Sequence, residues 1–240
     1  FMWDMTYAES ELPDEEETEE EVEFVRQVLK LRKGSYILDL CCGQGRHSVR
    51  LAERGFSVVG LDYSEELLKL AEKQEPKANL WFVKGDMRKI PFSMNTFDAV
   101  INLFTSFGFF SDDENLETLK SISSVLKPKG KFILDYWNPY VAVQLDGTRN
   151  WWWINDSLLS LAEVRYDFSL GRLYDVRTII NIKERSIKNA VRSLRFYTLP
   201  EIDELLKKAG MLITQVYGDI DEREYDGETR RLITVSEKVI

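Results

Sequence analysis

The sequence predicts an α/β protein built on a mostly parallel β-sheet that is doubly wound, with helices on both faces. Three observations lead to this fold class. Short apolar runs alternate with helical patterns from Tyr36 to Tyr136, a turn with two glycines follows the first run, and an acidic residue ends the second. Strands separated by helices form βαβ units, and these units place parallel strands between helical layers.

Length and charge narrow the class of protein. The chain has 240 residues, 44% of them hydrophobic, and a net charge of −9. This charge argues against a nucleic-acid partner, because binding phosphates needs a basic face. No apolar run approaches the ~20 residues of a membrane span, and the early acids Asp4, Glu9 and Glu11 are unlike a signal peptide. We expect a cytoplasmic protein with no nucleic-acid and no membrane partner.

The N-terminal region is expected to be an irregular arm followed by an amphipathic helix. The arm carries Trp3 and Tyr7, and eight of the ten residues 14–23 are acidic. Acids in a first helical turn complement the helix dipole, so the acidic run is interpreted as the solvated start of a helix. This helix is expected to begin at Pro13 and to end near Gly34.

The elements that follow alternate regularly. We predict strands at 36–40, 57–61, 80–83, 97–102 and 131–136, and helices at 46–54, 65–74 and 112–126. From 137 to 197 the pattern changes to period two, which predicts an antiparallel meander of about three strands at 158–168, 173–183 and 186–197. Thr198 and Glu201 predict a capping box for helix 200–209. Strands 211–217 and 230–238 are expected to close the sheet as an edge hairpin.

The first glycine turn is a candidate ligand loop. Gly43 and Gly45 follow the first strand, and Asp62 ends the second strand 19 residues after Gly43. Backbone N–H groups of such a loop can approach a ligand, and the carboxylate of Asp62 can accept from both hydroxyls of a ribose. The third glycine of the dinucleotide fingerprint is missing, so this pair alone does not separate NAD from another adenosine cofactor.

Other strand ends favour one cofactor. Asp39, before the loop, would repel a pyrophosphate but suits an ammonium group, which S-adenosylmethionine carries. Asp86 ends the third strand and could accept from an adenine amino group, with Met87 beside the ring. The loop after the fourth strand carries Phe104 and Phe107, where a substrate could meet the cofactor.

These motifs together resemble the class I S-adenosylmethionine-dependent methyltransferases, small-molecule type. The similarity covers about 36–136 and 198–238, through ILDLCCGQG, VVGLDYS, VKGDMRKIPF, FDAVINLFTSFG, LKPKGKFILD and YTLPEIDELLKKAGM. It implies a seven-stranded sheet of order 3-2-1-4-5-7-6 with strand 7 antiparallel. Residues 1–136 and 198–240 would form the cofactor-binding Rossmann-like domain, with 1–34 as arm and helix, and 137–197 an inserted antiparallel subdomain.

The resemblance also implies the cofactor site, residue by residue. Asp62 would hold the ribose, Asp86 and Met87 the adenine, and Asn102 would offer its backbone near the sulfonium. An aromatic residue of the arm, here Tyr7, would close over the site. The full set implied for S-adenosyl-L-methionine is Tyr7, Asp39, Cys41, Gly43, Gly45, Arg46, Asp62, Tyr63, Asp86, Met87 and Asn102.

No catalytic residue and no metal site is predicted. The single histidine, His47, lies in the first turn of a helix behind the loop, where a structural role is favoured over that of a general base. Cys41 and Cys42 are adjacent, which disfavours a disulfide, and two cysteines alone make no zinc site. Arg46 either reaches the cofactor carboxylate or is solvated.

The insertion is expected to decide the substrate. Its aromatic residues would form either a lid over a small acceptor or the interface of a homodimer, since exposed aromatics favour both. Candidate substrate residues are Phe104, Phe107, Trp137, Tyr140 and Trp152. The predicted activity is methyl transfer to a small molecule by direct in-line displacement. The alternatives are a non-catalytic or regulatory cofactor-binding protein and, less favoured, an NAD-dependent oxidoreductase.

Overall fold

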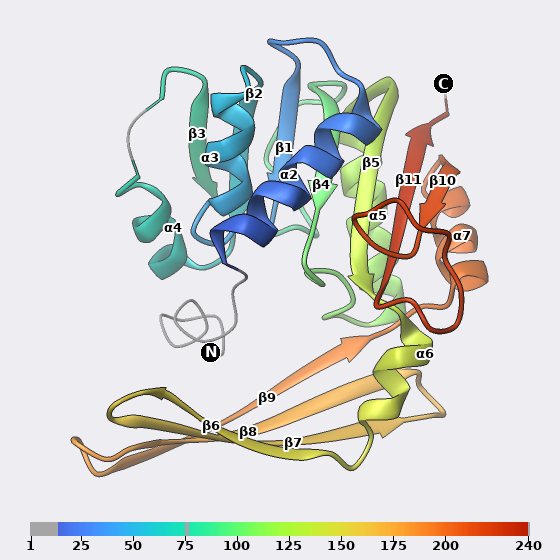
Figure 1. Cartoon of the computed structure of the whole chain (residues 1–240). Helices are drawn as coiled ribbons and strands as arrows, with labels where there is room; N and C mark the ends of the chain where they lie inside the picture. Colours follow the sequence, from blue (N-terminus) through green and yellow to red (C-terminus); the bar gives the residue numbers. More distant parts are fainter. Residues whose placement is uncertain (1–13, 75–76, 240) are drawn as a thin grey trace.

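The computed structural model describes residues 14–74 and 77–239, and its larger sheet has the predicted order (Figure 1). Its strands are β1 (Tyr36–Leu40), β2 (Ser57–Asp62), β3 (Leu80–Lys84), β4 (Phe97–Asn102), β5 (Leu126–Trp137), β10 (Met211–Tyr217) and β11 (Arg231–Lys238). The order is β3-β2-β1-β4-β5-β11-β10, and only β11 and β10 run antiparallel to their neighbours. The expected 3-2-1-4-5-7-6 arrangement is confirmed.

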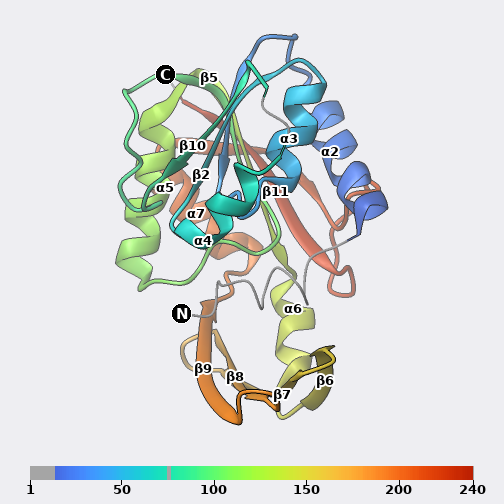
Figure 2. The same cartoon turned by 90° about the vertical axis from the view of Figure 1, so that its left-hand side faces the viewer.

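Helices cover both faces of this sheet, as Figure 2 shows. They are α2 (Glu15–Leu29), α3 (Arg46–Glu53), α4 (Glu65–Ala71), α5 (Asp112–Val125) and α7 (Leu199–Lys208). Apolar residues of α2 and α3 pack with one set of strand side chains, while α5 and α7 pack with the other set. The near-continuous apolar strands are therefore buried on both sides, as parallel sheets require.

Local signals explain most helix ends. Asp14 caps α2 by accepting from the backbone N–H of Glu17 at 2.9 Å, and α2 ends at Leu29 because Lys30 adopts a left-handed conformation (φ 50°). The predicted end near Gly34 is thus five residues too late, and Pro13 lies outside the described residues. The predicted capping box of α7 is present: the Thr198 N–H donates to Glu201 Oε2 at 2.8 Å.

A second, antiparallel sheet lies beyond the carboxyl ends of β1, β4 and β5 (Figure 1). It contains β6 (Arg149–Asn155), β7 (Leu158–Asp167), β8 (Arg172–Asn181) and β9 (Ser186–Arg195), in that order. A short helix, α6 (Pro139–Ala142), and a 3-10 turn, Val143–Leu145, lead into it. The expected meander had about three strands. The structure adds β6, because the tryptophan run 151–153 pairs with β7, a contact that its own pattern does not encode.

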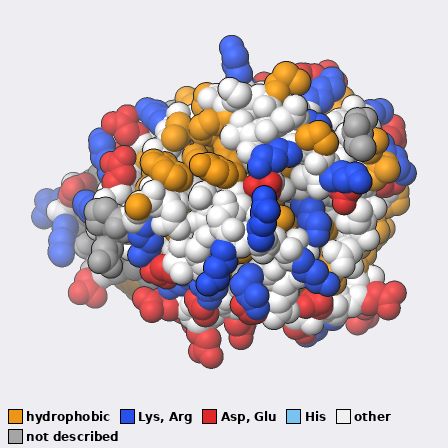
Figure 3. All heavy atoms as spheres, turned by 90° about the horizontal axis from the view of Figure 1, so that it is seen from above, with side chains coloured by type: hydrophobic (Ala, Val, Ile, Leu, Met, Phe, Trp, Pro, Cys, Tyr) orange, Lys and Arg blue, Asp and Glu red, His pale blue; other side chains and the backbone are white. Residues whose placement is uncertain are grey.

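The face at the amino ends of the parallel strands carries many lysine and arginine side chains (Figure 3). Two of these cations have structural partners there. Lys127 Nζ lies 2.8 Å from Asp98 Oδ1, and Lys131 Nζ donates to the Leu29 carbonyl at 3.0 Å, where α2 ends. These contacts tie α2, β4 and β5 together at the end of the molecule opposite the second sheet.

Among the helices of the described residues, none combines the length and the apolar character needed to cross a membrane.

Candidate active site

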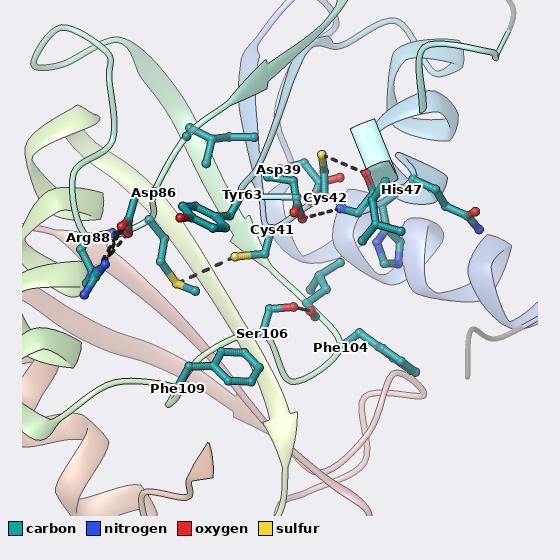
Figure 4. A pocket seen from close by; sticks show the side chains of 18 of the residues that line it. Asp39, Cys41, Cys42, His47, Tyr63, Asp86, Arg88, Phe104, Ser106 and Phe109 are labelled. Atoms are coloured by element: carbon teal, nitrogen blue, oxygen red, sulfur yellow. Dashed lines mark hydrogen bonds and ion pairs between the residues drawn. The ribbon is translucent and has the colours of Figure 1, made fainter. Parts of the chain in front are cut away.

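A cavity of about 570 Å³ lies between the carboxyl ends of the parallel strands and the second sheet. This volume suits a small-molecule or cofactor site. Figure 4 shows its side chains, with Asp39, Tyr63 and Asp86 toward one end and Phe104, Ser106 and Phe109 toward the other. The glycine-loop end is lined by Asp39, Cys41, Cys42, Gly43, Gln44, Arg46, His47, Leu61, Asp62, Tyr63, Leu67, Gly85, Asp86, Met87 and Arg88. The aromatic end is lined by Leu103, Phe104, Ser106, Phe109, Phe110, Val191, Arg192 and Ser193.

The glycine loop has a backbone that few side chains allow. Cys41, Gly43 and Gly45 have φ values of 64°, 56° and 79°, and Gly45 is the N-cap of α3. A Cβ at Gly45 would lie 2.6 Å from the Phe82 ring, so this position also needs glycine for space. The N–H of Cys41 donates to the Leu61 carbonyl at 2.7 Å, which fixes the loop against β2.

Asp62 is positioned by two backbone groups. Its Oδ2 accepts from the Gly43 N–H and its Oδ1 from the Ser64 N–H, both at 2.8 Å. Burial raises the pKa of this carboxyl, while the two N–H donors oppose that rise. Each oxygen keeps a further lone pair, and Asp62 lines the cavity, so the carboxylate can accept from a pair of hydroxyls.

Asp39 lies deeper, below the loop. Its side chain is buried and accepts from Ser48 Oγ at 2.5 Å. Burial also raises the pKa of Asp39. Asp39 and Asp62 thus place two carboxylates around the loop, an arrangement that suits an ammonium group and a ribose but opposes a pyrophosphate.

Asp86 is engaged by a neighbour. Its carboxylate accepts from Arg88 Nη2 at 2.7 Å and from the Arg88 backbone N–H at 2.9 Å, and these bonds lower its pKa. Met87 Sδ lies 3.8 Å from Cys41 Sγ, and Tyr63 is 63% exposed at the rim. The expected adenine residues therefore share one edge of the cavity, with the Asp86 carboxylate already bound to an arginine.

His47 and Arg46 share one acid. His47 is buried with Nε2 2.8 Å from Glu21 Oε2, and the same carboxylate pairs with Arg46. Arg46 lies over the Phe104 ring at 5.0 Å, and its buried Nη2 has no hydrogen-bond partner among the described residues. His47 therefore has a structural contact, whereas Arg46 keeps a donor near the cavity that it lines.

Several expected substrate residues lie elsewhere. Phe107 is buried in the core, 5.9 Å from the Tyr197 ring, and does not line the cavity. Trp137 and Tyr140 are exposed outside it, and Trp152 packs under Arg177 at 5.3 Å. Of the five candidates, only Phe104 lines the cavity.

Asn102 and Tyr7 complete the predicted set. The side chain of Asn102 donates to the Leu40 carbonyl at 2.9 Å and does not line the cavity, because it links β4 to β1. Tyr7 and Trp3 lie outside the described residues.

Sequence reasoning missed the contribution of β9. Val191, Arg192 and Ser193 reach the cavity because β9 is the edge strand beside the loop after β4. Gly108 makes this approach feasible: its carbonyl accepts from the Arg195 N–H at 2.8 Å, and a Cβ there would lie 2.3 Å from the Arg195 carbonyl oxygen. The signal available in the sequence was Gly108 itself, because a glycine beside aromatic residues can mark a close approach of another backbone segment.

Within 14–74 and 77–239, no three His, Cys, Asp or Glu side chains are grouped to hold an ion. Cys41 and Cys42 are free thiols whose pKa is raised, first of all by burial. Neither is activated as a nucleophile.

The fold and this cavity define a class of protein. A doubly wound sheet with a glycine loop after β1, an acid at the end of β2 and a cavity at the carboxyl ends of the strands is a Rossmann-like site for a nucleoside-containing cofactor. The two carboxylates around the loop favour S-adenosylmethionine over a dinucleotide.

Comparison with known proteins also points to a methyltransferase. Residues 37–130 match the family model described as "Methyltransferase domain". The putative methyltransferase YqeM of Bacillus subtilis is 29% identical over 211 residues, 84% of this chain and 83% of that protein. The demethylmenaquinone methyltransferase of Lactococcus lactis is 38% identical over 106 residues, 42% of this chain, and the chain spans 41% of its length.

Solved structures share the fold over nearly the whole chain. The CcbJ methyltransferase of Streptomyces caelestis superimposes with a TM-score of 0.81, at 23% identity, over 100% of both chains. CalS10 of Micromonospora echinaspora, an amino pentose methyltransferase solved with S-adenosylmethionine bound, has a TM-score of 0.70 at 22% identity, covering 97% of this chain and 94% of its own. Residues 37–130 therefore resemble a methyltransferase domain, and the chain shares the fold of solved methyltransferases, one of them with S-adenosylmethionine bound.

Proposed function

We propose that this protein transfers the methyl group of S-adenosylmethionine to a small organic acceptor (EC 2.1.1.-). The observation that carries the proposal is the single cavity that joins the glycine-loop end to the aromatic end. A cofactor held at the first end and an acceptor at the second would meet inside one cavity. Proximity and orientation of this kind supply most of what a methyl transfer needs.

The glycine-loop end would hold the cofactor through several distinct contacts. Asp62 would accept from the ribose hydroxyls, and Asp39 would attract the ammonium group. Arg46 Nη2, a buried donor with no partner among the described residues, suits the cofactor carboxylate. The remaining proposed contacts are those of Tyr7, Cys41, Gly43, Gly45, Tyr63, Asp86, Met87 and the Asn102 backbone.

Bound S-adenosylmethionine would supply an activated sulfonium methyl for direct in-line displacement. The chain would supply position and a dry site: Phe104, Phe109 and Phe110 wall the aromatic end, and Val191 of β9 closes over it. The polar side chains described at this end are hydroxyls and guanidinium groups rather than bases. The acceptor nucleophile would therefore arrive already able to attack, as a neutral amine or an ionised oxygen or carbon.

The aromatic end also indicates the acceptor class. Its phenylalanine rings favour a small molecule with an apolar face, and the net charge of −9 disfavours a nucleic acid. The structural relative CalS10, an amino pentose methyltransferase, acts on a small molecule. We propose that residues 137–197 form the substrate-covering unit of this enzyme.

Calorimetry and turnover together test the proposal. S-adenosylhomocysteine, the product of transfer, should bind with one site per chain, and release of this product should be seen with at least one member of a panel of amines, phenols and carbon acids. Binding without turnover across the panel would favour a regulatory cofactor-binding protein. Absence of binding would reject the cofactor assignment, and NADH fluorescence would then test the dinucleotide alternative.

We also propose that two copies associate through the outward face of the second sheet. The cross-strand register places Trp153, Leu159, Ile180 and Ile187 in one row of this face. Trp153 and Ile187 of this row are exposed, and so are Trp151, Leu161 and Val176 of the neighbouring rows. Four strands of this length present on the order of 450 Å² of flat sheet. Exposed apolar side chains gathered on one such face mark an interaction site.

A second copy is the occupant that fits this face. The row of Trp153, Leu159, Ile180 and Ile187 is apolar, so this part of two identical faces can stack about a two-fold axis as a β-sandwich. Farther along the same face, Arg149 and Arg165 both pair with Glu163, which offsets part of their charge.

Light scattering after gel filtration tests the dimer. The wild type should have twice the chain mass, and Trp153→Glu with Ile187→Glu should give a folded monomer. Trp81→Glu is the matched control, since Trp81 is 46% exposed on β3 in the other sheet. A monomeric wild type at tens of micromolar would reject the interface.

A further inference from the structure

A buried ion cluster lies behind the aromatic end. Arg231, at the start of β11, is 3% exposed, and its Nη1 lies 2.9 Å from Asp135 Oδ2 near the end of β5. Its Nη2 lies 2.8 Å from Glu21 Oε1 on α2. Asp135 and Glu21 are also buried, and neither Asp135 nor Arg231 lines the cavity. Burying these charged side chains costs free energy of desolvation, so their presence here calls for a structural or functional explanation.

Asp135 has a second contact, with the loop after β4. The same Oδ2 accepts from the Phe104 N–H at 3.0 Å, and the Asp135 carbonyl accepts from the Thr105 N–H at 3.1 Å. Phe104 and Thr105 both have left-handed backbones, with φ of 58° and 57°. Aromatic and β-branched side chains rarely adopt this conformation, so the turn depends on the bonds that hold it.

This turn sets one wall of the cavity. The Phe104 ring lines the aromatic end of the cavity, and the guanidinium of Arg46, a residue of the glycine-loop end, lies 5.0 Å from the centre of the ring. Arg46 pairs with Glu21, which also binds Arg231. The contacts therefore run in a closed circuit from Phe104 through Asp135, Arg231, Glu21 and Arg46 back to Phe104.

We infer that Asp135 is a positioning residue for methyl transfer: locked by Arg231, it holds the Phe104 turn in its left-handed conformation and so places the Phe104 ring where cofactor and acceptor meet. The inference rests on the proposed function. It explains why an ion pair is buried behind an apolar wall, where an apolar pair would pack as well.

The test combines hydrogen exchange, calorimetry and turnover on Asp135→Asn, which keeps the shape of the side chain and removes its charge. Exchange of the peptide containing Phe104 and Thr105, measured with S-adenosylhomocysteine bound, should become at least tenfold faster. Turnover should fall about tenfold, while the affinity for S-adenosylhomocysteine should change less than threefold.

Two further variants separate positioning from loss of stability. Glu17→Gln removes a rim partner of Arg231, 3.2 Å from its Nη2, without contacting the turn, and should leave loop exchange unchanged. Thr105→Gly in the Asp135→Asn background should recover at least a third of the lost turnover, because glycine adopts the left-handed conformation without strain. A purely structural defect would not respond to that glycine.

The outcomes are distinct. If Asp135→Asn leaves both exchange and turnover unchanged, the inference is wrong. If Asp135→Asn lowers turnover and the glycine recovers none of it, Asp135 acts on stability alone and the inference is also wrong. Should the wild type bind S-adenosylhomocysteine but methylate nothing, the proposed function fails, while the exchange measurement still decides whether Asp135 holds the turn.

Discussion

The two ends of the cavity are built in different ways. At the glycine-loop end, each acidic side chain lies at or near the carboxyl end of its own strand. Bonds from residues nearby in the chain help to hold it, as the Ser64 N–H holds Asp62 at 2.8 Å. At the aromatic end, the wall combines the loop after β4 with β9, about eighty residues later in the chain. The glycine-loop end is therefore encoded in short sequence motifs, whereas the aromatic end depends on contacts between segments that are far apart in the sequence.

This difference has a functional consequence. Because the bonds at the glycine-loop end are local, we expect the proposed cofactor site to tolerate changes in the second sheet. The aromatic end has no such independence, because Phe104 relies on Asp135 and β9 relies on Gly108. We therefore expect substitutions at the two ends to separate cofactor affinity from turnover.

The largest effect is expected from Asp62→Ala. The variant loses hydrogen bonds from a charged group to two ribose hydroxyls and the brace on the Gly43 N–H, which together contribute about 3 kcal/mol. S-adenosylhomocysteine should bind about 100-fold more weakly in calorimetry. Glu65→Ala, which removes an exposed carboxylate from the next helix, is the control, and an unchanged affinity in folded Asp62→Ala would refute the ribose assignment.

A smaller effect, at the other end, is expected from Gly108→Ala. The new Cβ would meet the Arg195 carbonyl oxygen at 2.3 Å, and the φ of 103° is unfavourable for alanine by about 1–2 kcal/mol. Turnover should fall roughly tenfold as β9 shifts, with cofactor affinity nearly constant. Gly227→Ala, which meets nothing within 4 Å, should behave as wild type. Equal losses of affinity and turnover would contradict the separation of the two ends.

The smallest effect is expected where the ends meet, at Arg88→Met. Arg88 bridges Asp86 and Glu114 and lies over the Phe110 ring at 4.3 Å, but its side chain is 39% exposed. Exposed ion pairs contribute about 1 kcal/mol or less, so affinity for S-adenosylhomocysteine should change less than about fivefold. A higher affinity for S-adenosylhomocysteine would indicate that Arg88 competes with adenine for Asp86. An affinity lowered more than tenfold would place Arg88 in the cofactor site.

Apolar periodicity and turn chemistry, which are local properties of the chain, predicted the parallel strands, the glycine loop and the acid at the end of β2. The sheet order followed from the resemblance of these motifs to a known family. It did not predict β6 or the position of Phe107. An aromatic run such as 151–153 becomes a strand only when a partner strand is available, and Phe107 turns to the core because Tyr197, ninety residues later, packs against it.

The sequence by itself determined the class of this protein, since residues close together in the chain place the strands, the loop and Asp62. Only the tertiary structure decided what faces the acceptor. The contacts of Asp135 with Phe104 and Arg231, and of Gly108 with Arg195, join segments that no short-range pattern relates. The physical reason is that hydrogen bonds and ring packing depend on distance in space. A sequence motif contains only the spacing of residues along the chain.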